Sequence, residues 1–547
     1  GTKNADEWVN QNMALKALQE VKMTDRWQCA SIVLATIFSV VCFSQETSAF
    51  VVPKASHLAR GLVRSFVDAP ASAHGEFTTR IPNVALYRPR PRVAALGMVA
   101  AETKETKPSV TGPSAAGAPL RIGMFGGGTV GGGVYEICEQ DKKSFLKGLG
   151  CDTEIVKICV RDSAKERDFR LESKTEVVTD REAILDDDSI NCVVELMGGV
   201  TTAKDVVFEA IRRNKHVITA NKALVATYLS EIQELLKDHP GVTFGYEAAV
   251  CGGIPIITTL QNDYPGDKIL KICGIMNGTT NFMLSKMESD GADYGDVLKE
   301  AQDLGYAEAD PTADVEGFDV QAKIALLTKL AFGATVSSDS VPCKGISQLS
   351  SVDFEYARMM RSTIKLLGTA MLSPDGQKLS VFVSPVVVPL SHPIASARGA
   401  GNIVSVDSKN MGTASFSGPG AGRYPTANSV VNDIVRLGVG KVGAPFPFDK
   451  EWKLETDFTA TFYIRITCKD DLGIIKRVGE LAAVNGVSIH AILQNPIEDP
   501  SNVDFVVTTD PCRRAMKRKS KSQMTKLSTS IAGETWAKGE PLVMPLL

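Results

Sequence analysis

Short apolar runs alternate with longer amphipathic stretches through the middle of the chain. Each run is only a few residues long and most are rich in Val or Ile, which is typical of strands, whereas the intervening stretches have helical length. Strands that alternate with helices predict a doubly wound parallel sheet of the α/β class. The predicted strands are Leu120–Phe125, Ile155–Val160, Cys192–Met197, His216–Thr219 and Val242–Tyr246.

A glycine-rich loop follows the first of these strands directly. Gly126 permits a tight turn, Gly128 lets the backbone approach a pyrophosphate, and Gly131 lets the next helix pack closely on the strand. That helix begins around Thr129 and Val130, and its free N–H groups attract phosphate. Such a loop alone also occurs in ordinary turns, but the strand–turn–helix context predicts a Rossmann-type dinucleotide site.

The end of the second predicted strand bears on the choice of cofactor. Arg161 stands where an acidic residue usually binds the ribose of NAD. A guanidinium there can pair with a 2′-phosphate, which favours NADP(H). The adjacent Asp162 leaves NAD(H) possible, and the alternative for Arg161 is an ordinary surface charge.

An acid-rich segment, residues 301–323, leads into an apolar helix predicted over Ile324–Phe332. Asp319 and Lys323 lie four residues apart at the start of this helix, so their side chains share one face. The plain structural interpretation is an exposed pair on a solvated helix, which adds little stability.

The acid-rich segment also resembles, position for position, the signature of the homoserine dehydrogenase family. The matching residues are Ala301, Gly305, Tyr306, Asp310, Pro311, Asp314, Gly317, Asp319 and Lys323. Other segments similar to the family are Glu195–Gly199, His216–Lys222, Glu247–Pro255, Asn277–Asn281, His392–Pro393, Gly418–Gly422 and Pro425–Ala427. The resemblance covers about Leu120 to Val442, and its many fixed residue types make it specific.

The resemblance implies reversible, NADPH-dependent reduction of aspartate 4-semialdehyde to homoserine, in threonine, methionine and isoleucine biosynthesis. Lys323 would donate the proton, because an ammonium with an ordinary pKa of about 10.4 is charged at neutral pH. Asp319 would orient Lys323 or hold the substrate's amino group, and Lys222 would bridge cofactor and substrate. The implied substrate contacts are Glu308, Asp314, Asp319, Tyr306, Gly278 and Thr279, and the further cofactor contacts are Gly198, Lys222, Gly420 and Gly422. Without the resemblance, Lys222 would be a surface lysine and Gly418–Gly422 a turn.

The family also implies a monovalent cation, commonly sodium, on the segment around Cys251. The matching positions are Glu247, Val250, Gly252 and Ile254. Carboxylate and carbonyl oxygens suit such a hard ion, although backbone ligands leave almost no trace in a sequence.

The carboxyl-terminal region has its own pattern. A strand over Thr461–Thr467, a helix ending near Val484, and strands over Val487–Leu493 and Val503–Thr508 give a βαββ order. With an Asp-x-Gly turn before the helix this resembles an ACT domain, although Leu472 replaces the usual Pro. The resemblance implies feedback control by threonine, with Gly473, Asn485 and Gln494 as candidate contacts; the alternative is a dimerisation module without a ligand. The tail beyond Asp510, basic and then rich in Ser and Thr, predicts a poorly formed last helix.

The first part of the chain reads as a targeting leader. An apolar run from about Cys29 to Phe43 is too short to span a bilayer and has the form of a signal peptide. A basic stretch with only Asp68 and Glu76 as acids follows, then a polar linker, Ala101–Pro119. This resembles the bipartite leaders that direct proteins to the plastid stroma; the alternative is a single membrane anchor.

Four parts are therefore expected along the chain. Residues 1–118 would be leader and linker, 119–250 with 412–445 an NADP-binding Rossmann domain, 251–411 an inserted α+β substrate and dimerisation domain, and 457–547 the ACT-like module. The formal net charge of −3 gives no basic field for nucleic acid, and we expect no membrane contact in the mature form. The family implies a homodimer or homotetramer, and the singly scattered cysteines indicate free thiols.

Two other functions remain open from the residues themselves. Another Rossmann dehydrogenase with an ACT tail would carry its glycine loop mid-chain and need a catalytic His, neither of which is seen. A non-catalytic nucleotide-sensing protein would not need Lys222, Glu308, Asp319 and Lys323 together.

Overall fold

The computed structural model describes residues 119–172, 174–441, 446, 448–455, 457–515 and 522–547. The predicted leader, residues 1–118, lies outside the described residues. Among the helices that are described, none has the length and apolar character needed to cross a membrane.

A six-stranded parallel sheet forms the first part of the fold, in the order β3-β2-β1-β4-β5-β6. In this order the strands continue outward in opposite directions from β1 and β4. Open α/β sheets bind their ligands at the carboxyl ends of the strands beside such a reversal of strand order. The strands are β1 (Leu120–Phe125), β2 (Thr153–Cys159), β3 (Glu176–Val178), β4 (Cys192–Glu195), β5 (His216–Thr219) and β6 (Phe244–Gly245). The predicted parallel α/β sheet is confirmed, and two of its strands match residue for residue.

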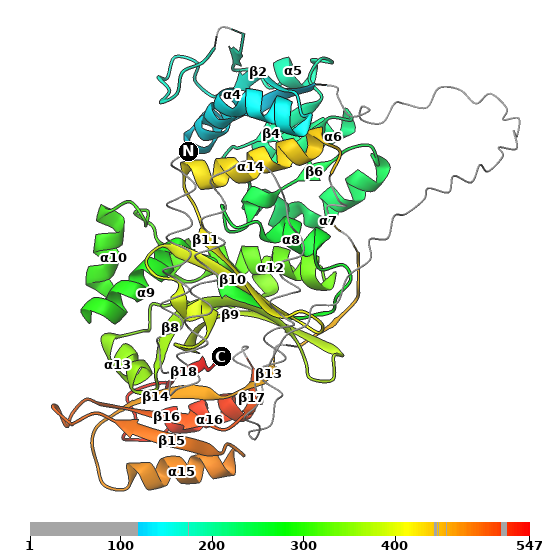
Figure 1. The fold of residues 1–547 in the computed structure, drawn as a ribbon. Coiled ribbons are helices and arrows are strands. Elements are labelled where there is room, and N and C mark those ends of the chain that lie inside the picture. The colour runs from blue at the N-terminus through cyan, green and yellow to red at the C-terminus, as the bar shows by residue number, and fades with distance from the viewer. Residues whose placement is uncertain (1–118, 173, 442–445, 447, 456, 516–521) are drawn as a thin grey trace, which may run out of the picture. The chain divides into compact units, whose positions relative to one another are not determined.

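Helices cover this sheet, and one of them comes from much later in the chain (Figure 1). They are α4 (Thr129–Leu149), α5 (Glu182–Leu185), α6 (Thr201–Arg212), α7 (Lys222–Asp238) and α14 (Arg423–Gly438). A Cβ on Gly133 of α4 would lie 2.9 Å from the Cβ of Ala427 on α14. Glycine therefore lets α14 approach α4 closely and returns the chain to the first sheet.

A second six-stranded sheet, in the order β11-β10-β7-β8-β9-β12, is built from the residues between β6 and α14, with one short strand added later. It is antiparallel except for β12, which runs parallel to β9. Its strands are β7 (Ile269–Ile275), β8 (Ser362–Leu372), β9 (Lys378–Pro389), β10 (Gly401–Ser408), β11 (Gly412–Pro419) and β12 (Lys453–Leu454). Its helices are η2 (Glu247–Ala249), α8 (Ile256–Asn262), α9 (Gly278–Asp290), α10 (Tyr294–Asp303), α11 (Thr312–Val315), α12 (Phe318–Phe332), η3 (Ser338–Ser340), α13 (Ser351–Met359) and η4 (Pro393–Ser396).

The carboxyl-terminal module is a four-stranded antiparallel sheet in the order β15-β16-β14-β18, with two helices and an additional β13–β17 pair. Its chain order, βαββαβ, is ferredoxin-like. The elements are β13 (Asp457–Ala460), β14 (Phe462–Cys468), α15 (Ile474–Val484), β15 (Ile489–Gln494), β16 (Val503–Thr509), β17 (Cys512–Ala515), α16 (Gln523–Ala532) and β18 (Leu542–Pro545).

The predicted βαββ order is therefore present, but it is extended by a helix and a strand, and the expectation of a poorly formed last helix was wrong. Helix α16 buries Met524, Leu527 and Ile531, which are spaced three and four residues apart and so lie on one face. The side chain of Ser522 accepts a hydrogen bond from the N–H of Thr525 and caps the helix. This short amphipathic pattern is hard to recognise in a tail that is basic and then rich in Ser and Thr.

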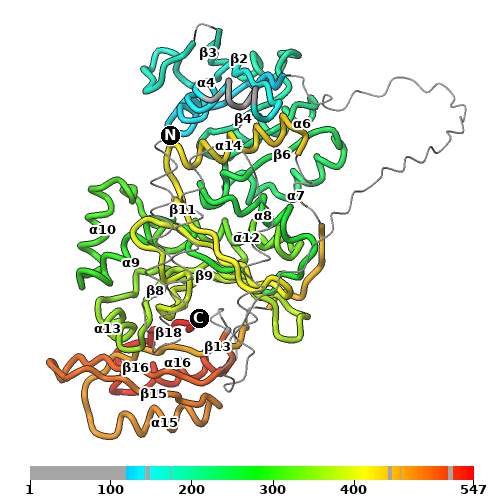
Figure 2. Tube along the Cα trace, viewed as in Figure 1, coloured from blue at the N-terminus to red at the C-terminus, as the bar shows by residue number. Residues whose placement is uncertain are grey.

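The module packs against the second sheet and helix α13 (Figure 2). The fully buried carboxylate of Asp353 accepts a hydrogen bond from the Tyr463 hydroxyl at 2.7 Å and lies 2.9 Å from Nε of Arg465. The rings of Phe382 and Phe458 stack with their centroids 4.3 Å apart. Both polar and apolar contacts thus join the module to the sheet that supports α12.

Candidate active site

The glycine loop after β1 has the geometry of a phosphate cradle. Gly126 has φ +109°, which favours glycine, and a Cβ on Gly131 would lie 2.1 Å from the carbonyl oxygen of Gly126. A Cβ on Gly128 would meet no atom within 4 Å, and no side chain caps the helix that starts at Thr129. The first N–H groups of α4, at Thr129 and Val130, are therefore available to a pyrophosphate, and the residues present fit a dinucleotide.

The loop after β2 carries the predicted 2′-phosphate contact. Arg161 is exposed, two residues beyond the end of β2. Arg167, which no sequence motif marks, donates hydrogen bonds of 2.9 Å to the carbonyl oxygens of Asp162 and Lys165. Its guanidinium also lies beside Gly127. Arg167 therefore shapes the loop that presents Arg161, and only its place in a basic loop could have indicated this.

A buried polar link fixes the start of α7 and with it Lys222. Glu195, fully buried at the end of β4, accepts a hydrogen bond of 2.6 Å from Thr219 at the end of β5, and burial raises its pKa. Asn221 accepts a hydrogen bond from the N–H of Leu224, which caps α7, and donates to the carbonyl oxygen of Gly199 at 2.7 Å. The same turn leaves the predicted cofactor contact Gly198 exposed.

Lys222, Asp319 and Lys323 meet at the start of α12. The carboxylate of Asp319 accepts hydrogen bonds from Lys222 through Oδ1 and from Lys323 through Oδ2, the latter at 2.8 Å. Lys323 also donates to the carbonyl oxygen of Met276 at 2.5 Å. The side chains of Lys323 and Asp319 are 9% and 5% exposed, whereas Lys222 is 45% exposed. The Asp319–Lys323 pair on α12 is therefore buried, which excludes the interpretation of these two residues as an exposed pair on a solvated helix.

Asn277, at the start of α9, extends this cluster. Its amide nitrogen donates to Asp314 at 2.6 Å and to Asp319 at 2.9 Å, while its amide oxygen caps α9 by accepting from the N–H of Thr280. In the sequence, Asn277 stands out only as part of a segment that is similar to the family. One amide therefore holds two predicted site carboxylates together.

The charges in the cluster stabilise one another. Burial alone would raise the pKa of Asp319, but the ammonium groups of Lys323 and Lys222 outweigh it and hold that pKa well below its ordinary value. Burial would also lower the pKa of Lys323, but the charge of Asp319 outweighs it and raises that pKa. Lys323 therefore remains a proton-bearing ammonium at neutral pH. Burial, with the charge of Asp319, raises the pKa of Asp314.

The other predicted substrate contacts lie on α9 and in the loop before α11. The hydroxyl of Thr279 donates to the carbonyl oxygen of Tyr306 at 2.7 Å, and a Cβ on Gly278 would lie 2.9 Å from the carbonyl oxygen of Ala400. The Tyr306 ring stacks on Phe282, with centroids 4.7 Å apart. Glu308 is exposed in the same loop, and its carboxylate forms none of the hydrogen bonds or ion pairs found among the described residues. The structure thus leaves Glu308 outside the polar cluster.

The predicted cation segment lies against the turn that leads into α14. The N–H of Gly253 donates to the carbonyl oxygen of Pro419 at 3.0 Å, and a Cβ on Gly252 would lie 2.6 Å from the carbonyl oxygen of Gly420. Gly422 has φ +125° and is the N-cap residue that precedes α14. The predicted cofactor contacts Gly420 and Gly422 therefore adjoin the Val250–Ile254 turn.

The carboxylate of Glu247 is used within the fold. Its oxygens accept hydrogen bonds from the N–H groups of Ile257 at 2.9 Å and Thr258 at 2.8 Å, and from the Thr258 hydroxyl, so they cap α8. A cation here would depend mainly on main-chain oxygens, including those of Val250 and Ile254. The carbonyl of Gly252 already accepts a hydrogen bond from Ser429. The described residues contain no group of three or more His, Cys, Asp or Glu side chains placed to hold a metal.

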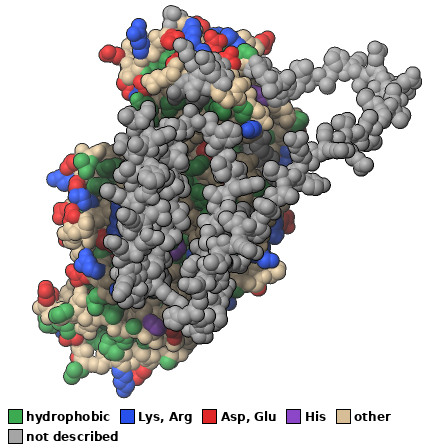
Figure 3. All heavy atoms as spheres, in the orientation of Figure 1, with side chains coloured by type: hydrophobic (Ala, Val, Ile, Leu, Met, Phe, Trp, Pro, Cys, Tyr) green, Lys and Arg blue, Asp and Glu red, His purple; other side chains and the backbone are tan. Residues whose placement is uncertain are grey.

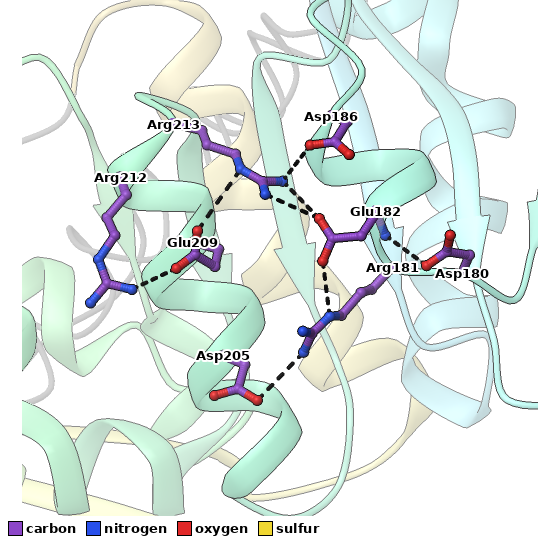
Figure 4. A network of polar contacts seen from close by, with 8 residues as sticks. All are labelled: Asp180, Arg181, Glu182, Asp186, Asp205, Glu209, Arg212 and Arg213. Carbon is purple, nitrogen blue, oxygen red and sulfur yellow. Dashed lines mark hydrogen bonds and ion pairs between the residues drawn. The ribbon is translucent and has the colours of Figure 1, made fainter.

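An open surface hollow over α5 and α6 is unrelated to this cluster. Charged side chains in and beside it pair with one another, as Arg213 does with Glu182, Asp186 and Glu209 (Figure 4). None of the predicted site residues lines it. We therefore place the candidate active site at the Lys222–Asp319–Lys323 cluster.

Two family models match the chain. One, described as homoserine dehydrogenase, matches residues 255–435, and the other, described as the NAD binding domain of homoserine dehydrogenase, matches residues 126–245. Together they include the glycine loop, the start of α7 and the acid-rich segment.

Known proteins similar to the chain carry the same description. The homoserine dehydrogenases of Bacillus subtilis and Synechocystis are each 40% identical to it, over 71% of this chain and 90% of the former, and 72% of this chain and 93% of the latter. A solved homoserine dehydrogenase from Thiobacillus denitrificans is 33% identical, with a TM-score of 0.72, covering 79% of this chain and 98% of that one. The Staphylococcus aureus enzyme at pH 7.5 is 29% identical, with a TM-score of 0.62, covering 79% and 99%.

Proposed function

The chain belongs to the homoserine dehydrogenase family and is an NAD(P)-dependent oxidoreductase acting on a CH–OH group, and we propose that it reduces L-aspartate 4-semialdehyde to L-homoserine with NADPH. The reaction is reversible and serves the synthesis of threonine, methionine and isoleucine. The observation that carries this proposal is the buried Asp319–Lys323 pair, joined by the half-exposed Lys222, next to a dinucleotide-binding sheet.

The nicotinamide supplies the hydride when it is bound. Lys323 then donates a proton from Nζ to the aldehyde oxygen, while Met276 and Asp319 fix the direction of the ammonium. The carboxylate of Asp319 binds one ammonium group through each of its oxygens. It therefore keeps Lys222 near the reacting atoms while Lys323 stays protonated. Asp314 and Glu308 are the carboxylates left to attract the substrate's amino group.

The proposal is tested by turnover of the purified full chain. Absorbance of NADPH should fall when aspartate 4-semialdehyde is added and should rise again, from NADP, with homoserine. A chain that binds NADPH but leaves its absorbance unchanged with aspartate 4-semialdehyde would contradict the assigned substrate.

Arg161 is proposed to select NADP(H) over NAD(H). Replacing it (Arg161→Ser) removes the cation that can pair with the 2′-phosphate, so kcat/KM with NADPH should fall about 10- to 100-fold, while kcat/KM with NADH changes little. The ratio of the two values measures this directly. The matched control is Arg181→Ser, an exposed arginine at the start of α5. Equal loss with both cofactors would show that Arg161 does not read the phosphate.

A monovalent cation, commonly sodium in the family, is proposed on the main-chain oxygens of the Val250–Ile254 turn.

 The engaged carboxylate of Glu247 supports a site made largely of carbonyl oxygens, which suits a hard ion. Turnover measured in sodium, potassium and tetramethylammonium salts at equal ionic strength tests it, and identical rates in all three would count against a bound cation.

The carboxyl-terminal module is proposed to be ACT-like and to bind threonine. Its βαββαβ order supports this, as does the turn before α15, where Gly473 has φ +88°. The proposed contacts are Gly473, Asn485 and Gln494. Calorimetric titration of the full chain with threonine distinguishes this role from that of a dimerisation module without a ligand, which would release no heat of binding.

A homodimer or homotetramer is proposed as the working assembly. The edge strands β11 and β15 support it, and so do the exposed apolar side chains of the module: Leu472 is 99% exposed and Val484 85%. Figure 3 shows apolar side chains gathered over the region of α15 and β15. Light scattering gives the mass in solution and separates dimer from tetramer.

Residues 1–118 are proposed as the plastid leader, on composition alone, which a fluorescent-protein fusion would test.

A further inference from the structure

Helices α7 and α12 are joined at two levels. In their first turns, Lys222 of α7 binds Asp319 of α12. Further along, Gln233 of α7 and Lys329 of α12 both bind the carboxylate of Asp449. Gln233 lies 11 residues after Lys222, and Lys329 lies 10 after Asp319. At about 1.5 Å per residue these are nearly equal rises, roughly 16 and 15 Å, so the helices run side by side with matched connections.

The second connection depends on a buried charge. The side chain of Lys329 has no exposed surface, whereas that of Asp449 is 59% exposed. Asp449 is the ion-pair partner of Lys329 among the described residues, and that hydrogen-bonded ammonium holds the pKa of Asp449 below its ordinary value. One carboxylate oxygen binds Lys329 and the other accepts from Gln233. A carboxylate held by a buried cation in this way has a fixed position from which to bind a second helix.

Asp449 belongs to neither helix. It lies in the strap, residues 448–455, which leads from the α14 side toward the carboxyl-terminal module (Figure 2). The N–H of Lys450 donates to the carbonyl oxygen of Gly333 at 3.1 Å, and the indole of Trp452 donates to that of Phe332 at 2.8 Å. Glu455 pairs with Arg513 of the module at 3.1 Å. The strap is therefore fastened to the end of α12 and to the module.

We propose that Asp449 is a positioning residue for the reaction: by tying α7 to α12 through Gln233 and Lys329, it keeps Lys222 in register with Asp319. This inference rests on the proposed roles of Lys222 and Asp319. Helix α7 is kinked at Tyr228, so its first turn does not rigidly follow its last. The second connection restricts the hinge motion that such a kink allows, and because the strap continues into the module, it also links the module to the site.

The test removes the bond to α7 while leaving the buried ion pair intact. In the full chain, Gln233→Ala should lower kcat for homoserine oxidation about five- to tenfold, with KM for NADP changed less than about twofold and the melting temperature nearly unchanged. Gln233→Lys should restore kcat, because its ammonium can reach Asp449. Glu234→Gln is the matched control: this exposed neighbour on α7 pairs with Lys237 of the same helix, and its loss should leave kcat unchanged.

A charge-balanced double variant provides the second measurement. Lys329→Met with Asp449→Ser removes both charges together, which avoids an unpaired buried ammonium, and it should reproduce the kcat loss of Gln233→Ala. Wild-type turnover of homoserine checks the proposed function separately. The positioning role is wrong if the wild type oxidises homoserine and Gln233→Ala has the same kcat. It is also wrong if Gln233→Ala lowers kcat and the kcat of Gln233→Lys is equally low.

Discussion

Replacing Lys323 by methionine should lower kcat for aspartate 4-semialdehyde reduction by about a thousandfold or more. A positioned general acid typically contributes about 10²- to 10⁴-fold, and here the lost group also polarises the carbonyl. Methionine keeps much of the side-chain volume, and Asp319 retains Lys222 as a partner, so the carboxylate is not left unpaired. The fold and the glycine loop should therefore persist, with NADPH binding nearly unchanged.

The comparison needs a lysine that is exposed and far from the cluster. Lys237→Met, in the last turn of α7, removes a 58% exposed ammonium that pairs with Glu234, and it should retain full activity. NADPH fluorescence and the melting temperature report whether Lys323→Met still binds cofactor and folds. If Lys323→Met turned over at the wild-type rate with cofactor bound, Lys323 would not be the proton donor.

The fold was largely predictable where the local pattern was strong. The strands Leu120–Phe125 and His216–Thr219 are bounded by turn residues and matched the structure, whereas Val242–Tyr246 shortened to Phe244–Gly245 at the edge of the sheet. An edge strand pairs with only one neighbouring strand, so fewer hydrogen bonds define where it begins and ends. Its length is therefore harder to predict from composition. Helix α16 was not expected to be well formed, because its three buried apolar residues lie among Ser, Thr and Lys and give only a weak helical pattern in the sequence. Packing of these apolar side chains within the folded module stabilises the helix.

The site was predictable as a motif but not as a set of contacts. The spacing of Asp319 and Lys323 places them on one face of a helix, yet only the fold shows that this face is buried and that Lys222 of helix α7 contacts it. Asn277 acts through hydrogen bonds to residues 37 and 42 positions away, which no local spacing reveals. Arg167 binds nearby main-chain carbonyl oxygens instead, and the side-chain chemistry of the loop alone does not show which atoms it will contact. The connection through Asp449 likewise spans residues 233, 329 and 449, so sequence alone gave no sign of it.

Replacing Asp319 by asparagine should lower kcat about a hundredfold near neutral pH and move the alkaline limit of activity to lower pH. The wild-type carboxylate outweighs the effect of burial and raises the pKa of Lys323 above its ordinary value. Without that charge, burial and the neighbouring ammonium of Lys222 both favour the neutral amine, so the pKa of Lys323 should fall. Protonated Lys323 is the active form in reduction, and activity should then be lost at a lower pH than in the wild type.

The pH profile distinguishes this electrostatic role from a purely structural one. A structural defect would lower kcat equally at every pH, whereas loss of the Asp319 charge displaces the alkaline limb by about one unit or more. Asp303→Asn, an exposed acid at the end of α10, is the control and should keep both the rate and the limb of the wild type. An Asp319→Asn profile that is reduced in height but ends at the wild-type pH would show that another group keeps Lys323 charged. In that case Asp314, 2.6 Å from Asn277 in the same cluster, is the next carboxylate to replace.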